Sequence, residues 1–266
     1  MEELVSRAGR DPYRIMTDVF SSLAEETERF RQRYGAKLHW TVGWAVRERA
    51  LQALEPYILR IIQALADCGL CSRISPEATA AFLTHGVGST IMHESGAEYS
   101  DKASELRRGV NLLMGISDEE GALFSPYYAG YSDIPALIDL FSREKELFSP
   151  LAQSGEKLLP ARISEREVFV LRKGRQLAGA ILFSREYKSL DALLVAPECR
   201  RLGGAERLCV SALAQFDVGE ELRVLGSVPE GSPVEALLKQ FALHRNGEGG
   251  LTVTAPEKWR VKRHDA

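Results

Sequence analysis

The sequence predicts two domains of different class, an all-α bundle over residues 1–117 and an α/β domain with a mixed sheet over residues 123–266. Three observations lead to this prediction. Apolar residues recur at helical spacing through the first half, short β-branched runs joined by turns fill the second half, and an acidic segment at 117–121 separates the two. At 266 residues the chain is long enough to bury two ordinary cores.

Composition and charge exclude several classes of protein. Apolar residues make up 45% of the chain and charged residues 27%, which argues against disorder. The formal net charge of −3 gives no general attraction to nucleic acid, and the basic segment at 258–263 is too short to reverse it. The amino terminus lacks an apolar signal region and no segment stays apolar across a bilayer's width, so we expect a cytoplasmic protein without membrane association.

The four cysteines are too few to crosslink a chain of this size, and we expect them to be thiols. Cys68 and Cys71 have the CxxC spacing, but no thioredoxin-like strand precedes them and no second ligand pair lies nearby. Cys199 and Cys209 lie ten residues apart in the other predicted domain. We therefore expect no metal site and no redox centre.

Start signals divide the first half into five predicted helices. Asp11-Pro12 is a good N-cap followed by a good first helical residue, and Ser75-Pro76 repeats the pattern. Pro56 is interpreted as opening a new helix, which Gly69 closes with a left-handed cap. The five helices are expected to begin at Asp11, Leu38, Glu55, Ser75 and Asp101, and the last to end at Met114.

The fourth predicted helix carries small residues, Ala78, Ala81, Gly86 and Gly88, which would let another helix backbone approach closely. We expect a helix-to-helix or subunit interface there. His85 and His93 lie on the same segment, where a histidine is either a ligand contact in a bundle cavity or a structural group.

The second half alternates strands and helices. An N-cap signal at 132–135 opens a helix that carries Leu137, Ile138 and Phe141. Two β-rich runs around the turn Lys173-Gly174 predict a hairpin over 168–183. Four further elements are expected: a strand at 190–195, a helix at 204–216, a strand at 222–228 and a helix at 233–243, followed by a last strand at 251–254.

The junction after the strand at 190–195 is the most informative stretch. Val195-Ala196-Pro197 leads into a basic, glycine-containing turn at 200–205 and then into a helix rich in alanine and leucine. The first turn of a helix has unpaired N–H groups and the positive end of the helix dipole, and glycines let a phosphate approach the backbone closely. The sequence therefore predicts a site for a diphosphate.

These elements, in this order over about 123–259, resemble the GNAT superfamily of acyl-CoA-dependent N-acetyltransferases. The family's signature, Arg or Gln, two residues, Gly, one residue, then Gly or Ala, is met at 200–205 and preceded by the usual Val-x-Pro. The resemblance implies that acetyl-CoA binds here, its diphosphate on the amides of the turn and its pantetheine arm on the strand. The residues it assigns to acetyl-CoA are Leu194, Val195, Arg200, Arg201, Leu202, Gly203, Gly204 and Ala205.

The resemblance implies a carboxylate or a water chain that removes a proton from the amine, and often a tyrosine that protonates the leaving thiolate. Asp191 is the best-placed base, four residues before Val195 and therefore expected on the same face of the strand, and Glu186 is the alternative. A salt-bridged or solvated role is open for both. The family's Tyr-x-x-x-Gly-Phe signature falls on Leu238 and Ala242-Leu243, so Tyr187 or His244 would have to supply the acid.

The first half resembles the ligand-binding and dimerisation domain of TetR-type regulators. The resemblance rests on Leu54-Glu55-Pro56 opening a helix, Gly69 closing it, and Ser75-Pro76-Glu77 starting a helix rich in small residues. It implies a homodimer and a small apolar ligand. Only Glu2-Glu3-Leu4 precedes the first helix, so we expect no helix-turn-helix DNA reader in this chain.

Together these features predict an N-acetyltransferase that moves an acetyl group from acetyl-CoA to a small amine or a protein amine by direct attack. Two alternatives stay open. One is a sensor that binds acyl-CoA without turnover, which the missing tyrosine favours, and the other is a TetR-like transcription factor without its DNA-binding motif.

Overall fold

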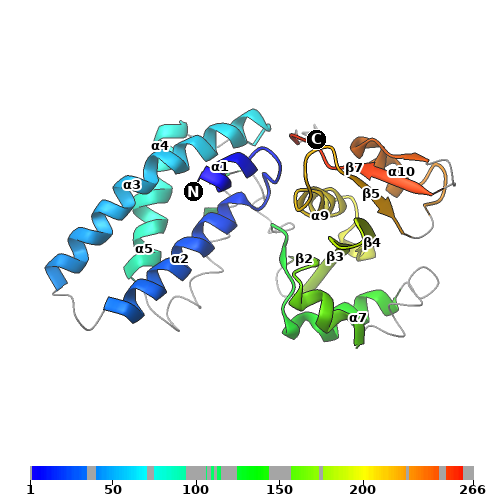
Figure 1. Cartoon of the computed structure of the whole chain (residues 1–266), viewed down its shortest axis with the longest axis horizontal. Helices are drawn as coiled ribbons and strands as arrows, with labels where there is room; N and C mark the ends of the chain where they lie inside the picture. Colours follow the sequence, from blue (N-terminus) through cyan, green and yellow to red (C-terminus); the bar gives the residue numbers. More distant parts are fainter. Residues whose placement is uncertain are drawn as a thin grey trace. The chain divides into compact units, whose positions relative to one another are not determined.

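We describe a computed structural model of the chain over residues 2–34, 40–70, 75–93, 106, 109–110, 113–114, 125–143, 157–173, 176–225, 228–245 and 250–259. Contacts divide the chain into two compact units, Met1–Glu119 with Lys258–Ala266, and Glu120–Glu257. The first unit is helical and the second holds a mixed sheet (Figure 1). None of the described helices is long and apolar enough to cross a membrane.

Amphipathic helices build the first unit. They are α1 (Glu2–Arg7), α2 (Ile15–Tyr34), α3 (Trp40–Asp67), α4 (Pro76–Ala81), a π-helical segment η1 (Phe82–Gly88) and α5 (Ser89–His93). The apolar spacing read from the sequence is confirmed, because Ile15 and Val19 on α2 and Ile58, Ile61 and Leu65 on α3 are all buried. The predicted helix at 101–114 and the linker at 117–121 lie largely outside the described residues.

Helix α3 continues through Pro56, so the prediction of two helices separated at this proline is wrong. A proline removes the N–H that would bond the carbonyl four residues earlier, at Gln52, and this weakens a helix without having to end it. Gln52 and Pro56 are both exposed, so water can bond that carbonyl. Leu51 and Ile58 are buried on either side, and their packing holds the helix together.

Two other helix signals have different outcomes. Ser75 caps α4 as predicted, since its Oγ accepts the N–H of Ala78 at 3.2 Å. Helix α2 instead begins four residues later than Asp11, because the carbonyl of Asp11 accepts the N–H groups of Arg14 and Ile15 in a preceding turn. A Cβ added to Gly88 would lie 3.0 Å from Leu51 Cδ2, in line with the predicted close approach of a second helix.

The last described residues belong to the first unit, although the sequence places them in the predicted domain 123–266. The backbone N–H of Trp259 donates to the carbonyl of Gly9 at 2.8 Å, and the Trp259 side chain is buried. The side chain of Lys258 lies against Gly9. The second unit therefore ends at Glu257.

A mixed sheet forms the centre of the second unit. Its strands are β1 (Tyr127–Tyr128), β2 (Val168–Lys173), β3 (Gln176–Ser184), β4 (Ser189–Val195), β5 (Glu221–Val224), β6 (His244–Arg245) and β7 (Leu251–Thr254). Across the sheet they follow the order β1-β2-β3-β4-β5-β7-β6. β4 and β5 run parallel, whereas the other described neighbours are antiparallel.

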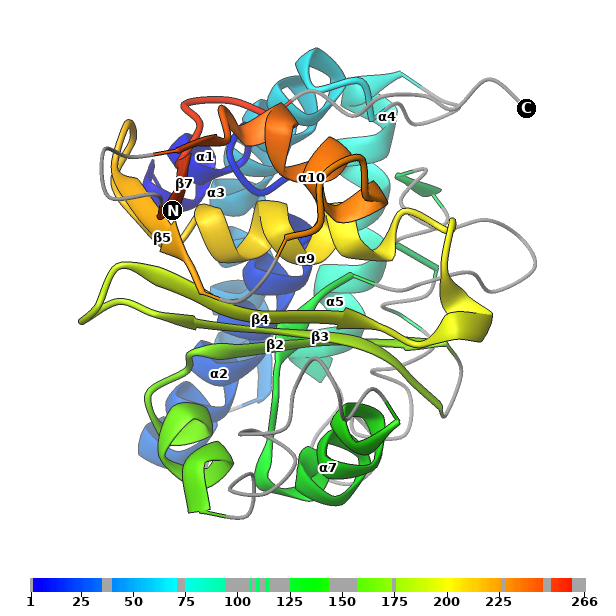
Figure 2. The same ribbon diagram turned by 90° about the vertical axis from the view of Figure 1, so that its right-hand side faces the viewer.

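Helices cover both faces of this sheet (Figure 2). α9 (Gly204–Leu213) lies on one face, and α7 (Ile134–Ser142) with the helical segment 157–164 lies on the other. α10 (Pro233–Leu238) precedes the last two strands. Phe183 stacks with Phe169 at 5.4 Å between ring centroids and meets Phe216 edge-on at 5.9 Å, which fills the α9 side of the core.

The predicted order of hairpin, strand, helix, strand, helix and strand is confirmed. The boundaries shift, since α9 ends at Leu213, β5 ends at Val224, and Lys239–Phe241 form a 3₁₀ turn rather than more of α10. The two-residue strands β1 and β6 were not predicted, because runs this short have no visible period.

Candidate functional site

After β4, a short 3₁₀ helix, η3 (Pro197–Cys199), leads to the turn before α9, which we call the α9 turn (Arg200–Ala205). Two of its residues have left-handed backbone, Arg201 at φ +65 and Gly203 at φ +74. Gly203 is the N-cap of α9, and a Cβ added there would meet no atom within 4 Å. Glycine therefore suits this position for its backbone conformation, and the space beside it is open.

The α9 turn presents backbone donors. The first helical bond of α9 runs from the N–H of Arg207 to the carbonyl of Gly203 at 3.1 Å, so the N–H groups of Gly204 and Ala205 have no carbonyl within the helix. Arg200, Arg201 and Leu202 are exposed. N–H donors at the positive end of a ten-residue helix beside two guanidinium groups suit an anion such as a phosphate.

Next to this turn, β4 and β5 part. Among the described residues, the ladder between them contains Ser189↔Arg223 and Leu190↔Val224 and extends no further, whereas β3 pairs with β4 up to Val195. Within the part of the chain that the structure describes, one edge of β4 therefore has no paired strand over its last residues, and we call it the open edge. Such an edge offers N–H and C=O groups to an extended ligand.

The alternation of hydrogen bonds between β3 and β4 decides which residues of β4 direct their main-chain N–H and C=O groups to the open edge. The N–H of Ala196 donates to the carbonyl of Ala178 on β3, and in an antiparallel pair every second residue points the same way. The main-chain groups of Leu194 therefore point to β3, and those of Leu193 and Val195 point to the open edge. Of the two strand residues that the resemblance assigns to pantetheine, Val195 has its main-chain groups toward the open edge and Leu194 has them toward β3.

Side-chain hydrogen bonds and an ion pair fix the segment that leads from β4 into the α9 turn. Arg200 Nε donates to the carbonyl of Val195 at 3.2 Å. Glu198 accepts from Gln176 at 2.6 Å and pairs with Arg143 at 3.4 Å. A hydrogen bond from its own backbone N–H, then those from Gln176 and Arg143, lower the pKa of Glu198. These contacts tie the Glu198 carboxylate to β3 and to the residue that follows α7.

A bulge interrupts β4 at Asp191. The register between β3 and β4 steps from Leu182↔Ala192 to Phe183↔Leu190, so Asp191 has no partner of its own on β3. One extra residue in a strand reverses the alternation of side chains beyond it.

Asp191 and Val195 consequently lie on opposite faces of the sheet, and the prediction of a shared face is wrong. A Cβ added to Gly179, the partner of Val195, would lie 3.2 Å from Val195 Cγ2 and 3.3 Å from Leu208 Cδ1 of α9. Val195 therefore faces α9. Asp191 reaches Arg162, which belongs to the helical segment on the α7 side.

Asp191 lies in a mostly buried polar group that we call the Arg162 cluster (Arg162, Glu167, Ser189 and Asp191). Arg162 Nη2 donates to Asp191 Oδ2 at 2.6 Å, and Ser189 Oγ donates to Asp191 Oδ1 at 2.5 Å. Arg162 Nη1 donates to Glu167. Burial raises the pKa of Asp191, although the bonds from Ser189 and Arg162 oppose this effect.

The other predicted catalytic residues lie elsewhere. Glu186 and Tyr187 are exposed in the turn before β4, about eight residues or roughly 25 Å of strand from Val195. His244 lies on β6, three strands and about 14 Å from β4, and its Nε2 is 2.8 Å from Thr252 Oγ1. Leu238, where the resemblance would expect a tyrosine, is buried. The structure brings none of the three polar candidates to the open edge of β4.

Arg162 and Glu167 lie beside the candidate base Asp191, and the sequence pattern did not reveal them. Arg162 lies in a segment without a motif, 29 residues before its partner Asp191. Glu167 is buried, and its Oε1 also accepts the backbone N–H of Arg185 at 2.7 Å. Charged residues are mostly exposed in folded proteins, so no sequence signal pointed to the burial of Glu167.

The remaining polar candidates form no second centre in the described chain. His85 pairs with Glu55 at 3.0 Å on the exposed side of α3, whereas the His93 side chain and Cys71 lie outside the described residues. Cys68, Cys199 and Cys209 are buried, and burial raises the pKa of Cys209 to about 12. No group of three or more metal-binding side chains occurs among the described residues.

Comparison with known proteins finds a structural similarity and no match in sequence. Neither a protein-family model nor a curated protein matches the sequence. Among solved structures, the chain is similar to a GNAT-family acetyltransferase from Bacillus cereus ATCC 10987, with 14% identity and a TM-score of 0.40. The likeness covers 53% of this chain and 100% of the Bacillus cereus chain.

Proposed function

We propose that the second unit binds acetyl-CoA and transfers its acetyl group to an amine of a small molecule or a protein. The observation that carries this proposal is the parting of β4 from β5 beside the α9 turn. The open edge at Leu193 and Val195 suits the amide groups of a pantetheine arm, and the α9 turn suits the diphosphate.

Ala242 supports the same reading of the fold. Its backbone is left-handed, at φ +53, at the position where the GNAT signature has glycine. Residues other than glycine are uncommon in this region of φ, so Ala242 has the backbone conformation that a glycine would favour at this position.

The proposed chemistry is direct attack. Asp191 accepts a proton from the acceptor ammonium, and the nitrogen lone pair then attacks the thioester carbonyl carbon. The carbon–sulfur bond breaks, its electron pair leaves with sulfur, and the sulfur takes up the second proton lost by the nitrogen. The products are the N-acetyl amine and free CoA thiol.

A second candidate is an acyl-CoA sensor without turnover. Leu238 favours it, because a buried leucine stands where the family often has its acid. Neither candidate depends on the homodimer or the apolar ligand that the resemblance of the first half implies.

Calorimetric titration of the full chain with CoA tests the binding site. We expect saturable binding, weakened about 100-fold or more in Gly203→Glu, because a carboxylate would face the diphosphate and like charges cost several kcal/mol. Gly219→Glu is the matched control, since Gly219 also has positive φ, +79, and open space around it. Unchanged binding in Gly203→Glu would refute the site.

Thiol release over a broad panel of amines then separates the two candidates. Release above the rate of thioester hydrolysis supports the transferase. Saturable binding without release supports the sensor.

A further inference from the structure

Arg162 stands between two carboxylates in the Arg162 cluster. Its Nη2 bonds Asp191 at 2.6 Å and its Nη1 bonds Glu167, while Nη1 also lies 3.4 Å from the carbonyl of Phe183. The three charged side chains come from separate places, the helical segment 157–164, the residue before β2, and the bulge of β4.

The cluster is poorly hydrated and its charges do not balance. The exposed fractions of the side chains are 24% for Arg162, 6% for Glu167 and 12% for Asp191. One guanidinium facing two carboxylates leaves one negative charge in excess. Interactions between charges at such depth are stronger than at the surface, so each neighbour acts appreciably on Asp191.

We propose that Arg162 and Glu167 are positioning residues that act on Asp191 in opposite directions and so set the charge with which Asp191 meets the acceptor amine. Arg162 stabilises the ionised carboxylate and holds it under the bulge. Glu167 repels that carboxylate and takes up part of the guanidinium's hydrogen bonding, so Arg162 does not neutralise Asp191 fully. The link to catalysis rests on the proposed function, whereas the electrostatic balance rests on the geometry alone.

The other groups near Asp191 fit this assignment. Ser189, on the same strand, donates to the second carboxylate oxygen. Arg223 of β5 pairs opposite Ser189, but its guanidinium donates to the carbonyl of Tyr187. Lys188 is paired with Glu220 at 2.7 Å. Arg162 is therefore the cation that bonds Asp191 among the described residues.

Titration of the Asp191 carboxyl carbon by ¹³C NMR tests the proposal in the full chain. The resonance is assigned by its loss in Asp191→Asn. We expect Arg162→Gln to move the titration midpoint up and Glu167→Gln to move it down. Ser189→Ala, which removes only a hydrogen bond, moves it up as well.

The opposite signs exclude a merely structural role, because loosening the cluster would move the midpoint in one direction for both variants. Midpoints that stay fixed or shift the same way in Arg162→Gln and Glu167→Gln overturn the proposal. If Arg162→Gln does not fold, Arg162→Lys replaces it, and its weaker pairing still predicts an upward shift.

Failure of this inference is separable from failure of the proposed function. The titration needs no substrate, and CoA binding by all variants is measured independently by calorimetry. Where the wild type releases thiol, the acid limb of its pH–rate profile moves with the NMR midpoint in each variant.

Discussion

The bulge at Asp191 lies on β4 and the α9 turn follows the end of that strand, yet the two are built in different ways. The α9 turn is made of consecutive residues, and its donors are backbone N–H groups set by two left-handed residues and a helix start. The Arg162 cluster is made of side chains from segments up to 29 residues apart in sequence. A site made of contiguous backbone leaves a motif, and a site made of distant side chains does not.

The two regions also respond differently to their surroundings. The guanidinium groups of the α9 turn are exposed to solvent, where salt screens their charges. The cluster is mostly buried, so its charges act on one another strongly. We therefore expect changes in the bulge to affect chemistry and changes in the turn to affect affinity.

Asp191→Asn has the largest expected effect. Removing a general base lowers a rate by roughly 100- to 10,000-fold, so acetyl transfer should fall by that factor while CoA affinity is kept. Steady-state thiol release and calorimetry measure the two quantities. Glu186→Gln, in the exposed turn before β4, is the control and should retain activity. A reversed pattern would make Glu186 the base.

Arg201→Ala has a smaller expected effect. Its exposed charge should contribute less than about tenfold to CoA affinity. Alanine and arginine both disfavour the left-handed backbone of this position to a similar degree, so the substitution should preserve the α9 turn. Calorimetry at low and high salt checks this, since the loss should disappear when salt screens the charge. Lys239→Ala, at an exposed position in the 3₁₀ turn after α10, is the control. A salt-independent loss of 100-fold would mean that side chains build this site.

The turns and caps were predictable because local chemistry dictates them. Ser75 caps α4, the hairpin closes after Lys173, and Gly203 starts α9, each from residues that are neighbours in sequence. The predicted helix start at Pro56 was wrong because distant residues, and not local chemistry, decide the structure there. Burial of Leu51 and Ile58 carries α3 through it, and that burial depends on partners far away in the chain.

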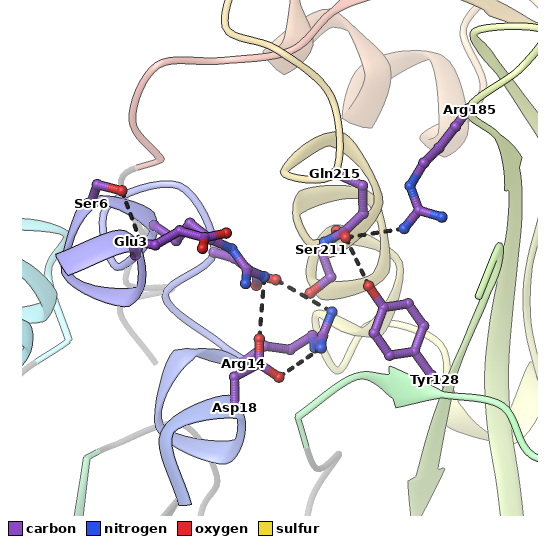
Figure 3. A network of polar contacts seen from close by, with 10 residues as sticks. Glu3, Ser6, Arg14, Asp18, Tyr128, Arg185, Ser211 and Gln215 are labelled. Atoms are coloured by element: carbon purple, nitrogen blue, oxygen red, sulfur yellow. Dashed lines mark hydrogen bonds and ion pairs between the residues drawn. The ribbon is translucent and has the colours of Figure 1, made fainter. Parts of the chain in front are cut away.

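The same distinction explains the site. The position of Asp191 on β4 was correct, but a bulge cannot be seen in one strand's sequence, since it is a mismatch between two strands. That one residue moved Asp191 to the α7 face and next to Arg162, and no pattern in the sequence pairs these two residues. The hydrogen bonds among Tyr128, Arg185 and Gln215 could not be predicted from the sequence either (Figure 3). Tyr128 Oη donates to Gln215 Oε1 at 2.7 Å, and the two residues are 87 positions apart.

The pH dependence of stability is the smallest expected effect, and it separates the two regions by sign. Burial raises the pKa of Asp191 above its ordinary value of 3.8, so the folded state holds that proton more tightly than the unfolded state. The resulting stability is fully present below pH 3.8 and is lost as pH rises through the folded pKa. The free energy of unfolding of the wild type minus that of Asp191→Asn should therefore fall as pH rises from 3 to 7.

Glu198, next to the α9 turn, should behave in the opposite way. Its pKa is lowered from the ordinary 4.5 by its own backbone N–H and by Gln176 and Arg143, so its contribution is present above pH 4.5 and is lost as pH falls through the folded pKa. Urea unfolding of wild type, Asp191→Asn and Glu198→Gln across this range measures both differences. Because Glu198 is exposed, its slope should be shallow and should flatten in high salt, whereas the slope for the buried Asp191 should persist. Slopes of equal sign would show that the two carboxylates do not lie in the contrasting environments described for the turn and the bulge.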